Sequence, residues 1–169
     1  MAPRQTPRIL VVGYGNPGRR DDGLGPAFAA RLEALRPLGV TIESDYQLSI
    51  EHAHLAAQHD IVVFADAAAD IEGESPFYLR PVQPAPEDRY SSHSVSPQAV
   101  LRLAAQCFGA HPSGWLLGIR PTDLESFAEG LTPEAESNLS AALTGFREAV
   151  ESGRFAPREV NSDNTPDAP

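Results

Sequence analysis

Lysine is absent from the 169 residues of this chain, and the sequence contains a single cysteine, Cys107. One cysteine excludes a disulfide framework and every metal site built from several cysteines. Without lysine there is no P-loop, because that motif uses a lysine to reach the phosphates. No hydrophobic run approaches the ~20 apolar residues of a membrane span, and no apolar secretory segment is found at the N-terminus. We therefore expect a cytoplasmic protein without a membrane partner.

Basic residues of any kind are also scarce, since the chain has 13 arginines and 23 aspartates and glutamates. The net charge is −10 and the isoelectric point is about 4.8. Nucleic acid and anionic membranes need a basic surface, so neither is an expected partner. The chain length fits one domain that buries a core without disulfides or structural metal.

Short apolar runs alternate with helical patterns, which is typical of an α/β domain. We expect a single three-layer α/β domain with helices on both faces of a mostly parallel five-stranded twisted sheet. The expected strands are 8–12, 40–44, 61–65, 77–82 and 115–119, and the expected helices begin near Pro26, Ser49, Ser96 and Thr132. This domain spans residues 1–155, and the polar tail 156–169 is predicted to be disordered.

Several side chains receive ordinary structural roles from these patterns. Helical spacing places Leu35 on the buried stripe of the first helix and Cys107 on the apolar face of the third. Ser49 is expected to cap the second helix. His52, like His54, His59 and His111, is predicted to lie on the surface or beside a helix.

The first loop allows two interpretations. Gly13-x-Gly15-x-x-Gly18 follows a strand, as in the dinucleotide-binding fingerprint. However, Pro17 interrupts the turn, and the paired acids Asp21 and Asp22 would place negative charge where a pyrophosphate must lie. Nucleotide binding is therefore the weaker interpretation. For Asp21 we favour a role in the loop or at the approach to a helix N-terminus.

Asp22, Asp66 and His93 are the candidate site residues. Each follows or ends a predicted strand or precedes a helix, so all three are expected at the carboxyl edge of the sheet, where ligands bind open parallel sheets. Two carboxylates and an imidazole suit a cation such as nickel or zinc and leave coordination positions open. Their ordinary alternatives are a turn-forming aspartate and a solvated histidine.

At five places the sequence resembles the nickel–iron hydrogenase maturation endopeptidases. The matching segments, in order, are Gly13-Tyr14-Gly15-Asn16-Pro17-x-x-x-Asp21-Asp22-Gly23-Leu24-Gly25, Asp60 to Ala67, Ser92-His93-Ser94-Val95-Ser96, Gly118-Ile119-Arg120-Pro121 and Gly130-Leu131-Thr132-Pro133. The similarity runs from about Arg8 to Val150, and five ordered motifs are far more specific than one glycine loop.

The resemblance implies a phosphorylase/hydrolase-like fold. It also implies an endopeptidase that removes the C-terminal extension of a nickel–iron hydrogenase large subunit after nickel insertion. Its metal-contacting and catalytic residues would be Asp22, Asp66 and His93. The nickel would be carried by the substrate, a nickel-loaded large-subunit precursor, and the enzyme would hold no tightly bound metal of its own. The chemistry would be aspartic-type or metal-assisted hydrolysis, with His93 as ligand or proton donor. The alternative is a non-catalytic nickel-checking or scaffold protein for hydrogenase assembly.

Overall fold

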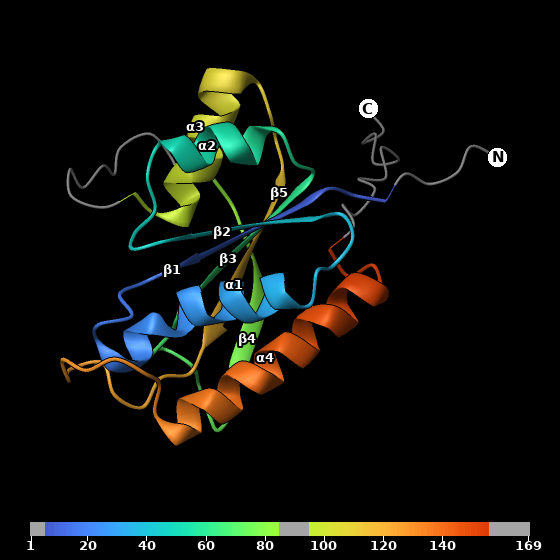
Figure 1. Cartoon of the computed structure of the whole chain (residues 1–169). Helices are drawn as coiled ribbons and strands as arrows, with labels where there is room; N and C mark the ends of the chain where they lie inside the picture. The colour runs from blue at the N-terminus through green and yellow to red at the C-terminus, as the bar shows by residue number, and fades with distance from the viewer. Residues whose placement is uncertain (1–5, 85–94, 156–169) are drawn as a thin grey trace, which may run out of the picture.

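The computed structural model describes residues 6–84 and 95–155 of the chain (Figure 1). In chain order the elements are β1 (Ile9–Tyr14), the short 3-10 helix η1 (Arg20–Gly23), α1 (Leu24–Ala34), β2 (Val40–Asp45), α2 (Glu51–Ala57), β3 (Ile61–Ala67), β4 (Phe77–Val82), α3 (Pro97–Phe108), β5 (Ser113–Ile119) and α4 (Pro133–Glu151). The expected elements are all present, with ends shifted by a few residues.

The strands form one sheet in the order β2-β1-β3-β5-β4. Four of them run parallel, and β4 pairs antiparallel with β5 at one edge. Residues 61–65 of the central strand β3 are all buried, as expected for a strand covered on both faces. The expected mostly parallel five-stranded sheet is therefore confirmed.

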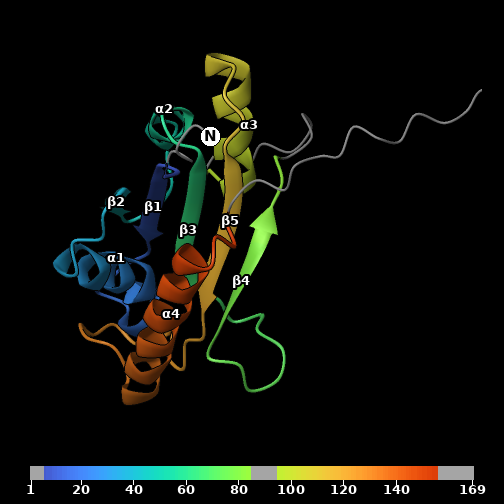
Figure 2. The same cartoon turned by 90° about the vertical axis from the view of Figure 1, so that its right-hand side faces the viewer.

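Helices cover both faces of the sheet, α1 and α4 on one side and α2 and α3 on the other (Figures 1 and 2). Alternate residues of each strand supply the two cores. Ile9 and Val11 of β1 face α1 and α4, whereas Leu10 and Val12 belong to the core beneath α2 and α3. This produces the three layers that the alternating pattern predicts.

The side of the sheet to which successive strands are added changes between β1 and β3, although the two strands are parallel. From β1 the chain crosses outward to β2, and it then returns to β3 on the other side of β1. In open α/β sheets, ligands bind at such a switch point, outside the carboxyl ends of the strands. The loop that follows β1 and the last residues of β3 meet there.

Two glycines bring α1 against this part of the sheet. A Cβ atom on Gly25 would collide with the carbonyl oxygens of Tyr14 and Ala65, and one on Gly13 would collide with the carbonyl of Gly25. The first turn of α1 therefore packs backbone against backbone over β1 and β3. This close approach carries the residues just before α1 toward the end of β3.

Two apolar side chains assigned to the core are exposed. The helix α1 ends at Ala34, so Leu35 lies beyond its last turn and is 55% exposed. Cys107 is exposed because the buried residues of α3 end at Ala104, and the last three residues of the helix are all exposed. Helical spacing assigns a residue to a face, but the position of the helix end decides whether that face is covered.

The predictions for Ser49 and His52 were also wrong. Ile50 occupies the N-cap position of α2, and no side chain caps it. Instead, Nδ1 of His52 accepts the backbone N–H of Ser49 at 2.9 Å, and His52 is buried with 5% exposure. His52 thus closes the first turn of its own helix.

Within residues 6–84 and 95–155, no helix has both the length and the apolar character needed to cross a membrane. The tail 156–169, predicted to be disordered, lies outside the described residues.

Candidate active site at the carboxyl edge of the sheet

Asp22 lies in η1, immediately before α1. Its Oδ2 accepts the backbone N–H of Asn16 at 3.0 Å, and its own N–H donates to the carbonyl of Arg19 at 3.0 Å. Gly15, with φ of +142°, packs so closely on the Asp22 carbonyl that a Cβ atom would collide with it. The glycine loop is therefore folded around Asp22, and its amide at Asn16 is already bonded to a carboxylate. This arrangement argues against the dinucleotide interpretation, which needs such amides free for a pyrophosphate.

Asp66 is the sixth residue of β3 and faces the same edge. Its Oδ1 accepts the backbone N–H of Ala67 at 2.8 Å, and its carboxylate also accepts a hydrogen bond from the Tyr14 hydroxyl. The sequence placed Asp66 at the carboxyl end of a strand, and the structure confirms that position.

The pKa of Asp66 is raised from 3.8 to about 6, mainly because the group is buried and in part because of the nearby negative charge of Asp22. The hydrogen bonds from Ala67 and Tyr14 act in the opposite direction but do not offset the burial. The two carboxylates thus lie close enough to repel each other. A cation held between them would relieve this repulsion.

Tyr14 was not identified from the sequence. Burial raises the pKa of its hydroxyl strongly, and the charge of Asp66 adds to that effect, so Tyr14 stays protonated and donates to Asp66. A signal for it exists in the strand alternation: Val12 and Tyr14 of β1 point to the same face as Phe64 and Asp66 of β3. Neighbouring parallel strands in this register place Tyr14 beside Asp66.

A cavity of about 390 Å³ opens next to Asp66. Its lining comes from four strands and the start of α3, and consists of Tyr14, Phe64, Asp66 to Asp70, Tyr78, Pro97, Gln98 and Leu116 to Gly118. His93, the third candidate, lies outside the described residues, although Pro97, four positions later in the sequence, lines this cavity. The grouping of His93 with the two aspartates stays a prediction.

In the part of the chain that the structure describes, no group of three or more histidine, cysteine, aspartate or glutamate side chains is placed to hold a metal ion. Asp22 and Asp66 are the two members of the predicted trio that lie among the described residues. The sequence hypothesis of a three-residue metal site therefore depends on His93.

Asp21 is a buried structural residue rather than a loop decoration. Its carboxylate accepts four hydrogen bonds: from the N–H groups of Thr122, Asp123 and Thr132 and from the Thr132 hydroxyl, at 2.8 to 2.9 Å. Burial raises the pKa of Asp21, but these bonds outweigh burial and hold it below its usual value. Because Thr132 is the N-cap of α4, the expected place of Asp21 near a helix N-terminus is correct, although that helix is not the next one in the chain.

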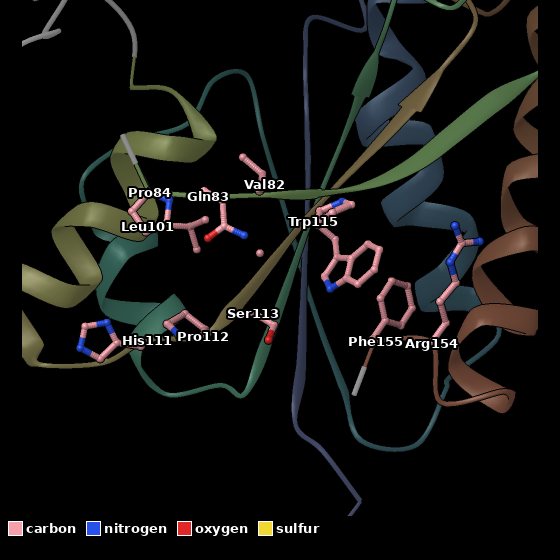
Figure 3. Close-up of a pocket in the computed structure, with 12 residues that line it drawn as sticks. Val82, Gln83, Pro84, Leu101, His111, Pro112, Ser113, Trp115, Arg154 and Phe155 are labelled. Atoms are coloured by element: carbon pink, nitrogen blue, oxygen red, sulfur yellow. The ribbon is translucent and has the colours of Figure 1, made fainter. Parts of the chain in front are cut away.

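A larger cavity, of about 640 Å³, lies at the opposite end of the sheet (Figure 3). Trp115 and Phe155 form one side of it, and His111 and Pro112 border it near the start of β5. Ser113, at the start of β5, pairs with Ile61 at the start of β3, whereas Asp66 pairs with Gly118. None of the described residues that line this larger cavity carries a carboxylate. This cavity therefore lacks the acidic groups that hydrolysis at the other edge would use.

Comparison with known proteins supports the resemblance drawn from the motifs. No family model matches the chain. It is 29% identical to the hydrogenase expression/formation protein HupD of Thiocapsa roseopersicina, over 98% of this chain and 77% of that protein. Among solved structures, the hydrogenase maturating endopeptidase HybD from E. coli is 26% identical with a TM-score of 0.67, covering 86% of this chain and 93% of HybD.

A second solved structure, the [NiFe] hydrogenase maturation protease HycI from Thermococcus kodakarensis KOD1, has a TM-score of 0.68 at 22% identity. The match covers 88% of this chain and 95% of HycI, and it shows that the two share a fold. The α/β architecture and the resemblance to the nickel–iron hydrogenase maturation endopeptidases are thus both confirmed.

Proposed function

We propose that this chain, which resembles the nickel–iron hydrogenase maturation endopeptidases in sequence and in fold, is itself such a peptidase. It removes the C-terminal extension of a hydrogenase large-subunit precursor after nickel has been inserted. The observation that carries the proposal is the pairing of Asp22 and Asp66 at the switch point of the sheet. Burial and the charge of Asp22 raise the pKa of Asp66 to about 6, and perturbed carboxylates beside a cavity are typical of active sites.

The nickel belongs to the substrate in this proposal. Asp22, Asp66 and His93 would contact it, and it would polarise the scissile carbonyl or activate a water molecule. Carboxylate and imidazole ligands from one protein leave positions for the substrate's own groups. Because three protein ligands leave the coordination of the metal incomplete until the substrate supplies its own groups, the free enzyme should bind nickel or zinc only weakly.

The chain's own residues hold the site in position. The N–H of Asn16 orients Asp22, while the N–H of Ala67 and the Tyr14 hydroxyl orient Asp66. A carboxyl group whose pKa is about 6 can exchange a proton near neutral pH, which suits a general base. Asp66 is therefore the residue we assign to proton transfer in an aspartic-type reaction, and both aspartates serve as ligands in a metal-assisted one.

The test incubates metal-free enzyme with nickel-free and with nickel-loaded large-subunit precursor and follows intact mass. Only the nickel-loaded precursor should lose the mass of its extension. The matched control is Asp45→Ala, which removes an exposed carboxylate at the end of the neighbouring strand β2 and should leave cleavage unchanged.

Equal cleavage of both precursors would contradict the role of nickel in recognition. An unchanged mass for both precursors would contradict the peptidase and favour the non-catalytic nickel-checking or scaffold protein. Tightly bound stoichiometric metal in the purified enzyme would indicate a metallopeptidase that binds a catalytic metal of its own.

A further inference from the structure

The loop 120–132, which joins β5 to α4, presents Phe127 to solvent with 85% of the residue exposed. Exposing a large aromatic side chain forgoes the free energy of burying it. Among the described residues, one other large hydrophobic side chain is exposed to this degree: Leu38, at 95%, which lies before β2 at the opposite end of the sheet. Phe127 therefore needs an explanation specific to its own edge of the sheet.

The loop carrying Phe127 is irregular in structure but firmly attached to the segment that carries Asp22. The N–H of Arg20 donates to the carbonyl of Ala128 at 2.8 Å, and the N–H of Asp21 donates to the carbonyl of Asp123 at 3.1 Å. The Asp21 carboxylate accepts hydrogen bonds from Thr122 and Asp123 at the start of this loop and from Thr132 at its end, so both ends are bonded to Asp21. In Figure 1 this loop, in orange, lies beside the blue segment that precedes α1.

Arg20 itself has φ of +50°, a conformation that few residues other than glycine adopt. Its guanidinium donates to the carbonyls of Glu129 and Gly130. Such strain persists only where the surrounding contacts impose it. The strained backbone and the loop thus form one preorganised unit with Asp22.

The Phe127 ring is also held in place. The guanidinium carbon of Arg19 lies 5.2 Å from the ring centroid, and Arg19 donates to the carbonyl of Leu124 at 3.4 Å. Arg19 is three residues before Asp22. An exposed aromatic side chain that is already oriented loses little conformational entropy when a partner covers it. Aromatic residues of this kind dominate the binding energy of many protein interfaces.

We propose that Phe127 is the docking anchor for the protein substrate, the large-subunit precursor, and enters an apolar pocket on its surface. This inference rests on the proposed function. The partner is the precursor rather than a second copy of this chain, because Phe127 adjoins the Asp22 segment. A dimer formed through Phe127 would cover the edge of the sheet where a protein substrate must enter.

The test measures the Kd between the protein and a nickel-loaded hydrogenase large-subunit precursor that retains its extension. Phe127→Ala should weaken binding by about tenfold or more, as loss of an interface hot spot does. Its thermal midpoint should stay unchanged, since the side chain is exposed. Phe127→Trp should restore most of the affinity. The control Leu38→Ala, at a residue that is even more exposed but lies at the other end of the sheet, should bind like the wild type.

A Kd for Phe127→Ala equal to that of the wild type would overturn the inference. It would also fail if Phe127→Ala instead converted a dimer to a monomer in sedimentation and left precursor binding unchanged. Phe127-dependent binding without cleavage would support the docking surface while contradicting the proposed peptidase. A wild-type protein that neither binds nor cleaves the precursor would contradict both.

Discussion

Replacing Asp66 by asparagine should stabilise the metal-free protein at neutral pH. Asparagine keeps the shape of the side chain and an oxygen that can accept the N–H of Ala67, and its amide can donate to the Tyr14 oxygen. It removes the negative charge that is buried and faces Asp22. The substitution therefore isolates the cost of ionising Asp66 in the folded state.

The magnitude follows from the pKa of Asp66, which rises from 3.8 to about 6 on folding, mainly because the group is buried. A difference of roughly two pKa units corresponds to about 3 kcal/mol, since each unit is worth about 1.4 kcal/mol. We take this as the upper limit of the gain, because a folded protein relaxes around a charge.

The sign depends on pH. Above pH 6 the carboxylate is ionised in both states, and the folded wild type bears the full cost. As the pH falls through about 6, the folded state takes up the proton first, so the wild type becomes more stable until the unfolded carboxyl is protonated near 3.8. The advantage of Asp66→Asn should therefore be largest at pH 7.5 and nearly absent below pH 4.

Urea unfolding at several pH values between 4 and 7.5 measures this difference. The matched control is Asp45→Asn, because Asp45 also accepts the N–H of the next residue, at 2.7 Å, but is exposed. A stability difference for Asp66→Asn that stays constant across this pH range would refute the reasoning. The same variant should lose processing activity despite its higher stability, as expected where a site trades stability for function.

Three further predictions address the rest of the site. Asp22→Ala, Asp66→Ala and His93→Ala should each abolish cleavage of the precursor with unchanged circular dichroism, and near-normal cleavage by any one of them would remove that residue from the mechanism. Asp21→Asn should lower the free energy of unfolding by about 1 to 3 kcal/mol, because its amide would face the N–H groups that now donate to the carboxylate; the exposed Asp70→Asn serves as the comparison, and equal unfolding midpoints would contradict the four-bond role. Gly25→Ala should cost about 1 to 3 kcal/mol in urea unfolding, since its methyl group would collide with the carbonyls of Tyr14 and Ala65. The comparison is Gly18→Ala, which also lacks a positive φ but would approach only the side chain of Asn16, at 3.2 Å, and should cost less.

The sequence by itself determined the sheet and the place of the two aspartates. Apolar runs such as Ile61–Ala65 are typical of strands buried on both faces. Proline after serine or threonine starts α3 and α4 as expected. Because parallel strands end at a common edge, Asp66 and the loop after β1 were expected at the same edge of the sheet, and the β1–β3 pairing then makes them neighbours. These are local or periodic signals, which the order of residues carries directly.

Only the tertiary structure decided how each charge is used. Asp21 and Asp22 are adjacent in sequence, yet Asp21 binds a loop about a hundred residues away while Asp22 faces Asp66. The choice depends on which distant amides approach each carboxylate, and no local pattern records it. Likewise, the register between β1 and β3 makes Tyr14 the partner of Asp66. The position of the end of α3 leaves Cys107 exposed.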